Sequence, residues 1–191
     1  MDTQTSVEKL LAKEEIRSAL YKWASSLGRH EWESVRSVFH DGALDAHGMF
    51  DGDIDGFVAW QRKHHAGIDQ SFYSIGAVLI EFATPDTALA ETHVTAFHRY
   101  GRDARQARLD LFGEAAAAEE KPMQSIIAGR FIDRFERRGG VWKIAERVTV
   151  YEWLKREDAP WNPPFQSGWH VGCPNRKDPL FAMRGKMGLA L

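Results

Sequence analysis

The hydrophobic period of this chain changes once, from about 3.6 residues to two, and this change restricts the fold more than any other feature. Between Ile16 and Leu27 the apolar side chains recur on one face of a helix, which Gly28 can end. Shorter helices are predicted around 32–39 and from Ile54 to about residue 65, with a short strand over 43–50 between them.

Beyond residue 70 the alternation typical of strands dominates the sequence. Strands are predicted over 71–83, 87–101, 123–137 and 141–153, with a hairpin turn at Arg138-Gly139-Gly140. A polar segment rich in alanine and glutamate, 102–122, is predicted to be either a mobile excursion or a short extra helix. This order predicts an α+β fold, in which three N-terminal helices wrap a strongly curved antiparallel sheet into a cone. The interior of such a cone is either filled or holds a ligand.

The remaining residues, 154–191, form a tail rich in proline, glycine and aromatic residues that has no periodicity. We expect it to pack on the domain formed by residues 1–153, or on a partner subunit. Its apolar anchors would be the aromatic side chains Trp161, Phe165, Trp169 and Phe181.

Charge and cysteine content exclude several classes of protein. The 25 basic and 27 acidic residues leave a net charge of −2, so no basic surface exists for nucleic acid or an anionic membrane. A single cysteine, Cys173, excludes an internal disulfide. No apolar stretch approaches the roughly 20 residues of a membrane span, and the polar residues 1–10 do not have the apolar h-region expected of a signal peptide. We therefore expect a cytoplasmic protein without a membrane partner.

Two stretches carry a resemblance to a known family. The run YKWASSLGRHEWESVRSVFHDGA resembles the opening motif of the SnoaL-like proteins of the nuclear-transport-factor-2-like superfamily, and AGRFIDRFERRGGVWKIAERVTVYEW is similar to their strand pair. The resemblance covers residues 7–153 and implies a cone-shaped, cystatin-like α+β barrel. Members include dehydratases, dehydrochlorinases, isomerases, polyketide cyclases, lyases and plain ligand binders. It further implies chemistry without a metal or organic cofactor, and a homodimer or homotrimer that covers the exposed sheet face.

The chain departs from this family at the catalytic pair. In the dehydratase-like members, an aspartate near the end of the first helix orients a histidine at the start of the first long strand. The corresponding positions here are Gly28 and Tyr73, and glycine has no side chain to orient anything. The proton-handling groups must therefore come from elsewhere in the chain.

Four residues are the candidates for this chemistry. Tyr73 can donate a proton or hydrogen-bond to a developing oxyanion, or it is a strand tyrosine that caps the core. His98 is the candidate base, or it makes a structural hydrogen bond at the rim. Asp45 and His47, two residues apart, share one face of a strand, so the carboxylate can orient the imidazole; alternatively both lie on a solvated edge.

Other side chains are expected to contact the substrate or to play structural parts. The resemblance turns the Val94 face of its strand inward, and Arg147 occupies the family's I-x-x-R position. The candidate contacts are Tyr21, Trp60, Val94, Tyr100, Phe131 and Arg147. Two adjacent histidines, His64 and His65, end the third helix and point about 100° apart, so they do not share one metal. A favourable interaction with the helix C-terminus explains at least one of them. No metal site is predicted, since a lone His170–Cys173 pair is too few ligands.

These residues favour a cofactor-independent lyase that acts on a small aromatic or hydrophobic substrate. The reaction would be a dehydration-type elimination, or C–C cleavage with release of formaldehyde from a lignin-derived aromatic diol. An isomerase or polyketide-type cyclase is an alternative that needs acid–base groups at both ends of a substrate. The other alternative is a non-catalytic ligand-binding protein, or an assembly subunit resembling the small chain of ring-hydroxylating dioxygenases.

Overall fold

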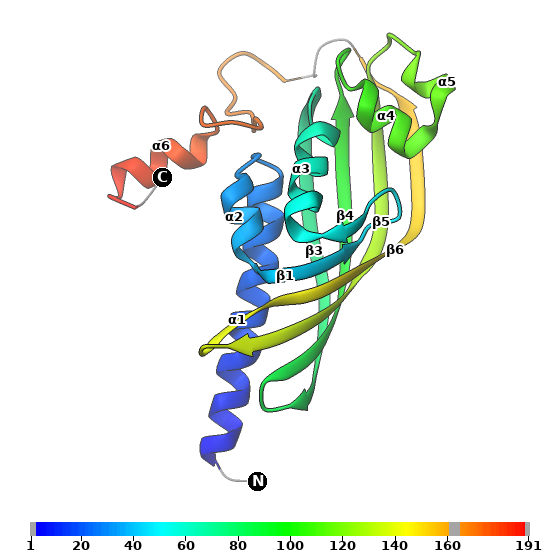
Figure 1. Ribbon diagram of the computed structural model, residues 1–191. Helices are drawn as coiled ribbons and strands as arrows, with labels where there is room; N and C mark the ends of the chain where they lie inside the picture. Colours follow the sequence, from blue (N-terminus) through cyan, green and yellow to red (C-terminus); the bar gives the residue numbers. More distant parts are fainter. Residues whose placement is uncertain (1–2, 161–164, 190–191) are drawn as a thin grey trace.

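The computed structural model describes residues 3–160 and 165–189, in which helices come first and long strands follow (Figure 1). The elements in chain order are α1 Thr3–Leu27, α2 Trp32–Ser37, β1 Phe39–Ala46, β2 Asp51–Asp53, α3 Ile54–His64, β3 Ile68–Thr84, β4 Thr87–Tyr100, α4 Arg105–Phe112, α5 Glu114–Ala117, β5 Met123–Arg138, β6 Val141–Asp158 and α6 Pro179–Lys186.

The strands form one curved, open sheet in the order β2-β1-β6-β5-β4-β3. Neighbouring strands are antiparallel, except that β1 runs parallel to β6. This arrangement confirms the predicted α+β fold. Figure 1 shows α1 running beside the long sheet, while α3, α4 and α5 stand together at one end of it. No helix among the described residues is long and apolar enough to cross a membrane.

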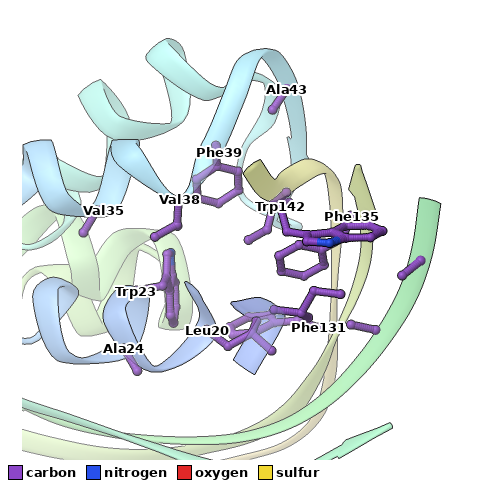
Figure 2. Packing of buried hydrophobic residues seen from close by; sticks show 14 of the residues in the cluster. Leu20, Trp23, Ala24, Val35, Val38, Phe39, Ala43, Phe131, Phe135 and Trp142 are labelled. Atoms are coloured by element: carbon purple, nitrogen blue, oxygen red, sulfur yellow. The ribbon is translucent and has the colours of Figure 1, made fainter. Parts of the chain in front are cut away.

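The main core lies between α1 and the concave face of the sheet. Trp23 of α1 is buried and packs edge-on against Phe131 of β5, with ring centroids 4.9 Å apart. Figure 2 shows this part of the core, where Leu20 and Trp23 lie with Phe39, Phe131 and Phe135. The helical period places these α1 side chains on one face, and the strand period places the aromatic side chains opposite them.

A bulge bends the sheet next to the core. Between the pairs Ala128–Trp153 and Gly129–Tyr151 the register shifts by one residue. A Cβ atom at Gly129 would lie 2.2 Å from the carbonyl oxygen of Val150, so only glycine fits where the two strands approach this closely.

The segment 102–122 forms the two short helices α4 and α5, which settles the two alternatives in favour of helix. Its interior holds the buried guanidinium of Arg108, which donates hydrogen bonds to the backbone carbonyls of Gly101 at 2.7 Å and Lys121 at 3.0 Å. Because these carbonyls lie on either side of α4 and α5, Arg108 ties both ends of the excursion together.

The tail contacts the rest of the chain at several points. The sheet continues to Asp158, five residues beyond the predicted end of the last strand. Farther along, the Asp178 carboxylate caps α6 and lies 3.1 Å from Nε of Arg29, in the turn that follows α1. Of the proposed anchors, Phe181 is buried and Phe165 and Trp169 are exposed, while Trp161 lies outside the described residues.

Candidate active site

A small cavity of about 60 Å³ lies between α3 and the concave face of the sheet. At about 30 Å³ per molecule in the liquid, this volume corresponds to roughly two waters. The expected hollow therefore exists but is small, because aromatic rings fill most of the interior. Its polar lining consists of His47, Gln61, His64, His65, Tyr73, His98, Thr149 and Tyr151.

The first proton-handling group is a histidine oriented by a carboxylate. Nδ1 of His47 lies 3.1 Å from Oδ1 of the fully buried Asp45 and 2.9 Å from Oγ1 of Thr149. Because a carboxylate only accepts hydrogen bonds, Nδ1 carries the proton and Nε2 keeps its lone pair. Within the described part of the chain, His47 Nε2 makes no hydrogen bond. The structure thus brings together Asp45 and His47, the pair expected from their spacing on one strand.

The second group is a half-buried tyrosine whose hydroxyl lies between two histidines. The hydroxyl oxygen of Tyr73 lies 2.9 Å from Nε2 of His65 and 2.9 Å from Nε2 of His98. His98 also contacts the hydroxyl of Tyr100 through Nδ1 at 3.1 Å, and that hydroxyl lies 2.8 Å from Oγ of Ser125. Both ring nitrogens of His98 are therefore engaged within the protein.

Burial decides the charge state of these groups. Desolvation lowers the pKa of His98 to about 3 and, with the neighbouring His64 adding to it, holds the pKa of His65 well below its usual range. The same loss of solvent raises the pKa of Tyr73 well above that of a free phenol. At neutral pH the three groups are uncharged, so Tyr73 keeps its proton.

A second histidine at the cavity, His64 of α3, is paired with a carboxylate of α4 that lies behind it. Nδ1 of His64 lies 2.8 Å from Oδ2 of Asp110, and the other carboxylate oxygen, Oδ1, accepts a hydrogen bond from Nε2 of Gln106 at 2.7 Å. Burial alone would raise the pKa of Asp110, but the hydrogen bonds from His64 and Gln106 offset this and the pKa is lowered. This pair was not predicted from the sequence, because nothing local to residues 64 or 110 indicates their contact.

His65 makes one contact that its place in the sequence predicts and one that it does not. Its Nδ1 contacts the carbonyl oxygen of Gln61 at 3.1 Å, which is the expected interaction with the helix C-terminus. Its Nε2 faces Tyr73, and this contact depends on how α3 packs over β3. His64 and His65 therefore both line the cavity in addition to ending the helix.

The apolar lining includes several predicted contact residues. Trp60, Val94 and Phe131 line the cavity, and Tyr100 lies buried behind His98. The indole of Trp60 stands between the two carboxylate-bound imidazoles, with ring centroids 5.7 Å from His47 and 4.9 Å from His64.

Two predicted contact residues lie away from this cavity. Arg147 is fully buried in a bidentate ion pair with Asp133, at 2.7 and 2.8 Å, and its guanidinium stacks over Phe131 and Trp23. The guanidinium of Arg147 can stay charged in the core, because the carboxylate of Asp133 and the aromatic ring faces compensate for the hydration that it loses on burial. Tyr21 is 49% exposed and lines a different cavity.

That outer cavity measures about 1050 Å³ and lies between the end of α1, the strands β3 to β6 and the tail. Tyr73 and His98 line both cavities, so they form part of the wall between them. Gly28 also lines the outer cavity, and a Cβ atom there would lie 3.3 Å from the backbone oxygen of Ser71. Within the described ranges, no three histidine, cysteine or acidic side chains are grouped as metal ligands would be.

Comparisons with solved structures agree with this architecture. A protein assigned as a scytalone dehydratase from Novosphingobium aromaticivorans is 16% identical, with a TM-score of 0.64 over 89% of this chain and 95% of that chain. The hexachlorocyclohexane dehydrochlorinase LinA type 2 is 12% identical, with a TM-score of 0.65 over 86% of this chain and 99% of that chain. A protein of cystatin-like fold from Nostoc punctiforme is 12% identical, with a TM-score of 0.54 over 74% of this chain and 92% of that chain. At these identities the likeness concerns the fold.

Family membership rests on the sequence itself. No curated protein matches the chain. The family model for the SnoaL-like domain matches residues 8–148, from the second turn of α1 into β6. This range contains most of α1, all of α2 to α5, and the histidines His47, His64, His65 and His98 that line the inner cavity. The chain belongs to the family of proteins with a SnoaL-like domain.

Proposed function

We propose that this protein is a lyase that eliminates a leaving group from a small, largely apolar molecule by acid–base catalysis. One observation carries the proposal: a carboxylate-oriented base, His47, and a proton-loaded phenol, Tyr73, line the same small cavity. An elimination needs both functions, since one proton leaves carbon while another reaches the leaving oxygen.

His47 is the base in this mechanism. Its Nε2 lone pair takes a proton from the substrate carbon, and the electrons of that C–H bond form the new double bond. The resulting imidazolium is stabilised by Asp45, which holds the opposite ring nitrogen and cannot leave its buried position.

Tyr73 is the acid. As the C–O bond breaks, its phenol proton passes to the leaving oxygen, which departs as water. A phenol whose pKa is raised by burial stays protonated until the leaving oxygen becomes more basic than itself. On the side of the inner cavity, hydrocarbon and ring surfaces such as Trp23 and Phe131 strengthen the few polar contacts that remain.

The substrate class follows from the walls and the size of the cavity. The side chains of Trp60, Val94 and Phe131 suit an aromatic or otherwise hydrophobic molecule. An aromatic ring exceeds the volume of two waters, so its entry requires half-buried wall residues such as Met49 and Leu111 to move aside. The dehydratase and dehydrochlorinase names of structural neighbours support elimination chemistry as the first to test.

The test is a turnover screen with small aromatic alcohols and diols. Loss of water appears as the absorbance of a conjugated alkene, whereas C–C cleavage releases formaldehyde. Asp45→Asn should reduce kcat by about 100-fold or more, because acid–base groups and their orienting partners contribute factors of that order.

The matched control is Asp51→Asn, which removes an exposed carboxylate from the neighbouring strand and should leave kcat unchanged. Equal activity of Asp45→Asn and the wild type would remove this dyad from the mechanism. Tight binding of these molecules without any turnover would instead favour a ligand-binding protein.

A second candidate function is isomerisation, and the His64–Asp110 pair favours it. Two carboxylate-oriented histidines at one cavity could take a proton from one carbon and return it to another. In deuterated water an isomerase product gains deuterium at carbon with no loss of water, which separates this candidate from the lyase. An intramolecular cyclase would be recognised by a ring product of unchanged mass.

A further inference from the structure

The hydrogen bonds around Tyr73 have directions that one backbone carbonyl determines. The carbonyl oxygen of Gln61 can only accept, so Nδ1 of His65 must carry the proton that fills this 3.1 Å contact. In a neutral imidazole the other nitrogen is then bare. Nε2 of His65 therefore accepts, and the Tyr73 hydroxyl donates to it.

This first assignment settles the next contacts in turn. The Tyr73 hydroxyl has a single proton, which it donates to His65. In the contact with His98 the Tyr73 oxygen must therefore accept, so Nε2 of His98 carries a proton. Nδ1 of His98 is then bare and accepts from the hydroxyl of Tyr100. The oxygen of Tyr100 in turn accepts from Ser125. Each hydrogen bond in the series therefore has one donor and one acceptor. Reversing any one of these hydrogen bonds would place two donors or two acceptors against each other.

Protonation of either histidine would disturb this order, but burial opposes it. Desolvation lowers the pKa of His98 to about 3 and that of His65 well below its usual range. Both rings are therefore neutral at pH 7, with one proton each. His98 has no lone pair directed at the cavity, since Nε2 carries hydrogen and Nδ1 is occupied.

We infer that His98 is a fixed hydrogen-bond donor to the Tyr73 oxygen, and that Tyr100 and Ser125 are positioning residues that hold it in this role. The inference rests on the proposed function of Tyr73 as the acid. When the Tyr73 hydroxyl turns from His65 to a leaving oxygen and gives up its proton, negative charge develops on the phenol oxygen. The Nε2–H of His98 already points at that oxygen and stabilises the charge without rearranging.

Each residue in this series of hydrogen bonds then has one role. His65 accepts and keeps the proton of Tyr73 in place before reaction, while His98 donates and receives the charge afterwards. Tyr100 and Ser125 are too far back to touch a substrate in the inner cavity, and act on it only through His98. Their contribution should therefore be visible in kcat and absent from KM.

The first test reads the tautomers directly and needs no substrate. Nitrogen NMR of the full chain with ¹⁵N-labelled histidine, at pH 7, should find His98 protonated at Nε2 and bare at Nδ1. His65 should show the opposite tautomer. An Nδ1–H tautomer or an imidazolium at His98 overturns the inference, whatever the activity of the protein turns out to be.

The second test uses variants that keep or remove the donor. The terminal amide of glutamine can donate from a position close to that of Nε2, so His98→Gln should keep kcat within about tenfold of the wild type. His98→Leu should lose about 100-fold or more, the loss expected when a donor to a developing oxyanion is removed. Equal losses in the two folded variants would identify His98 as a base and overturn the inference.

The third test addresses the positioning residues. Tyr100→Phe should lower kcat by about tenfold with KM unchanged, because His98 keeps its place but loses the donor behind it. The control is Thr92→Val, which removes another buried hydroxyl from the same strand, outside this series. A loss of kcat in the control as large as in Tyr100→Phe would overturn the positioning role. If the wild type turns over no substrate, the proposed function fails while the tautomer test still decides the hydrogen-bond directions.

Discussion

Nδ1 of His64 lies 2.8 Å from a carboxylate oxygen of Asp110, although 46 residues separate them in the chain. The contact joins the end of α3 to the excursion helix α4, which also supplies Leu111 to the cavity wall. The excursion is therefore a structural part of the cavity, and its attachment can be tested.

Replacing Asp110 with alanine should loosen α4. The change removes a charge-assisted hydrogen bond to His64, which contributes about 1.5–3 kcal/mol in such settings. We expect faster amide hydrogen exchange over residues 105–112 and a lower free energy of unfolding in urea. Gln106→Ala is the control, since it touches the same carboxylate from the exposed side of α4 and should have a small effect. Unchanged exchange in α4 would show that the pair does not hold the helix.

The stability of the protein should fall as the pH decreases below about 6.5. His65 and His98 are buried and neutral, with folded-state pKa values lowered by desolvation, to about 3 for His98. Below pH 6.5 the unfolded chain binds protons that the folded protein does not, so acid favours unfolding until the folded-state pKa is reached. Each histidine adds a slope of up to about 1.4 kcal/mol per pH unit in this window.

Urea unfolding between pH 4 and 7 measures this slope. His98→Gln should flatten it, because glutamine binds no proton in either state. His93→Gln, at an exposed position on the other face of the same strand, should leave the slope as in the wild type. A slope that does not change in His98→Gln would mean that His98 titrates normally in the folded protein.

In the buried ion pair between Arg147 and Asp133, removing one partner should destabilise the fold more than removing both. Burial raises the pKa of Asp133 even though Arg147 opposes the shift, so the carboxylate needs its partner. Arg147→Met should cost about 3–5 kcal/mol of unfolding free energy, and adding Asp133→Leu should recover much of it. Arg134→Met, which breaks an exposed pair with Glu146, should cost less than about 1 kcal/mol. Equal losses from the single and double variants would contradict this account.

The homodimer or homotrimer expected from the family resemblance stays a prediction, and the outer face of the sheet is where to test it. Phe72 and Phe97 are paired across β3 and β4 with ring centroids 6.0 Å apart, and are 63% and 41% exposed. Phe97→Arg should dissociate an oligomer formed through this face, as measured by light scattering during size-exclusion chromatography. Leu10→Arg, at an exposed site on α1, is the control. A monomeric wild type would refute the prediction.

Much of the fold was readable from the sequence because its signals are local. The change of period predicted helices followed by long strands, and the ends of α3 and of β4 lie within one residue of their predicted places. The errors fell where the signal is weak. The strand predicted over 43–50 runs instead from Phe39 to Ala46, and residues 47–50 connect it to a separate short strand, β2, at Asp51–Asp53. Pairing with a neighbouring strand decides such boundaries, and no residue pattern inside the segment records it.

The candidate site divides in the same way. Asp45 and His47 could be paired from the sequence, because two residues apart on a strand means one face, and Val94 and His98 share a face for the same reason. The contacts of Tyr73 with His65, and of His64 with Asp110, could not be predicted from the sequence, since they depend on how α3 and α4 pack over the curved sheet.

Periodicity alone thus determined which side chains each element presents on a common face, since that follows from backbone geometry over a few residues. The tertiary structure decided which faces meet, how much space is left between them, and which proton each hydrogen bond carries. Those properties depend on the curvature of the sheet and on a single carbonyl, that of Gln61, whose position no stretch of sequence specifies by itself.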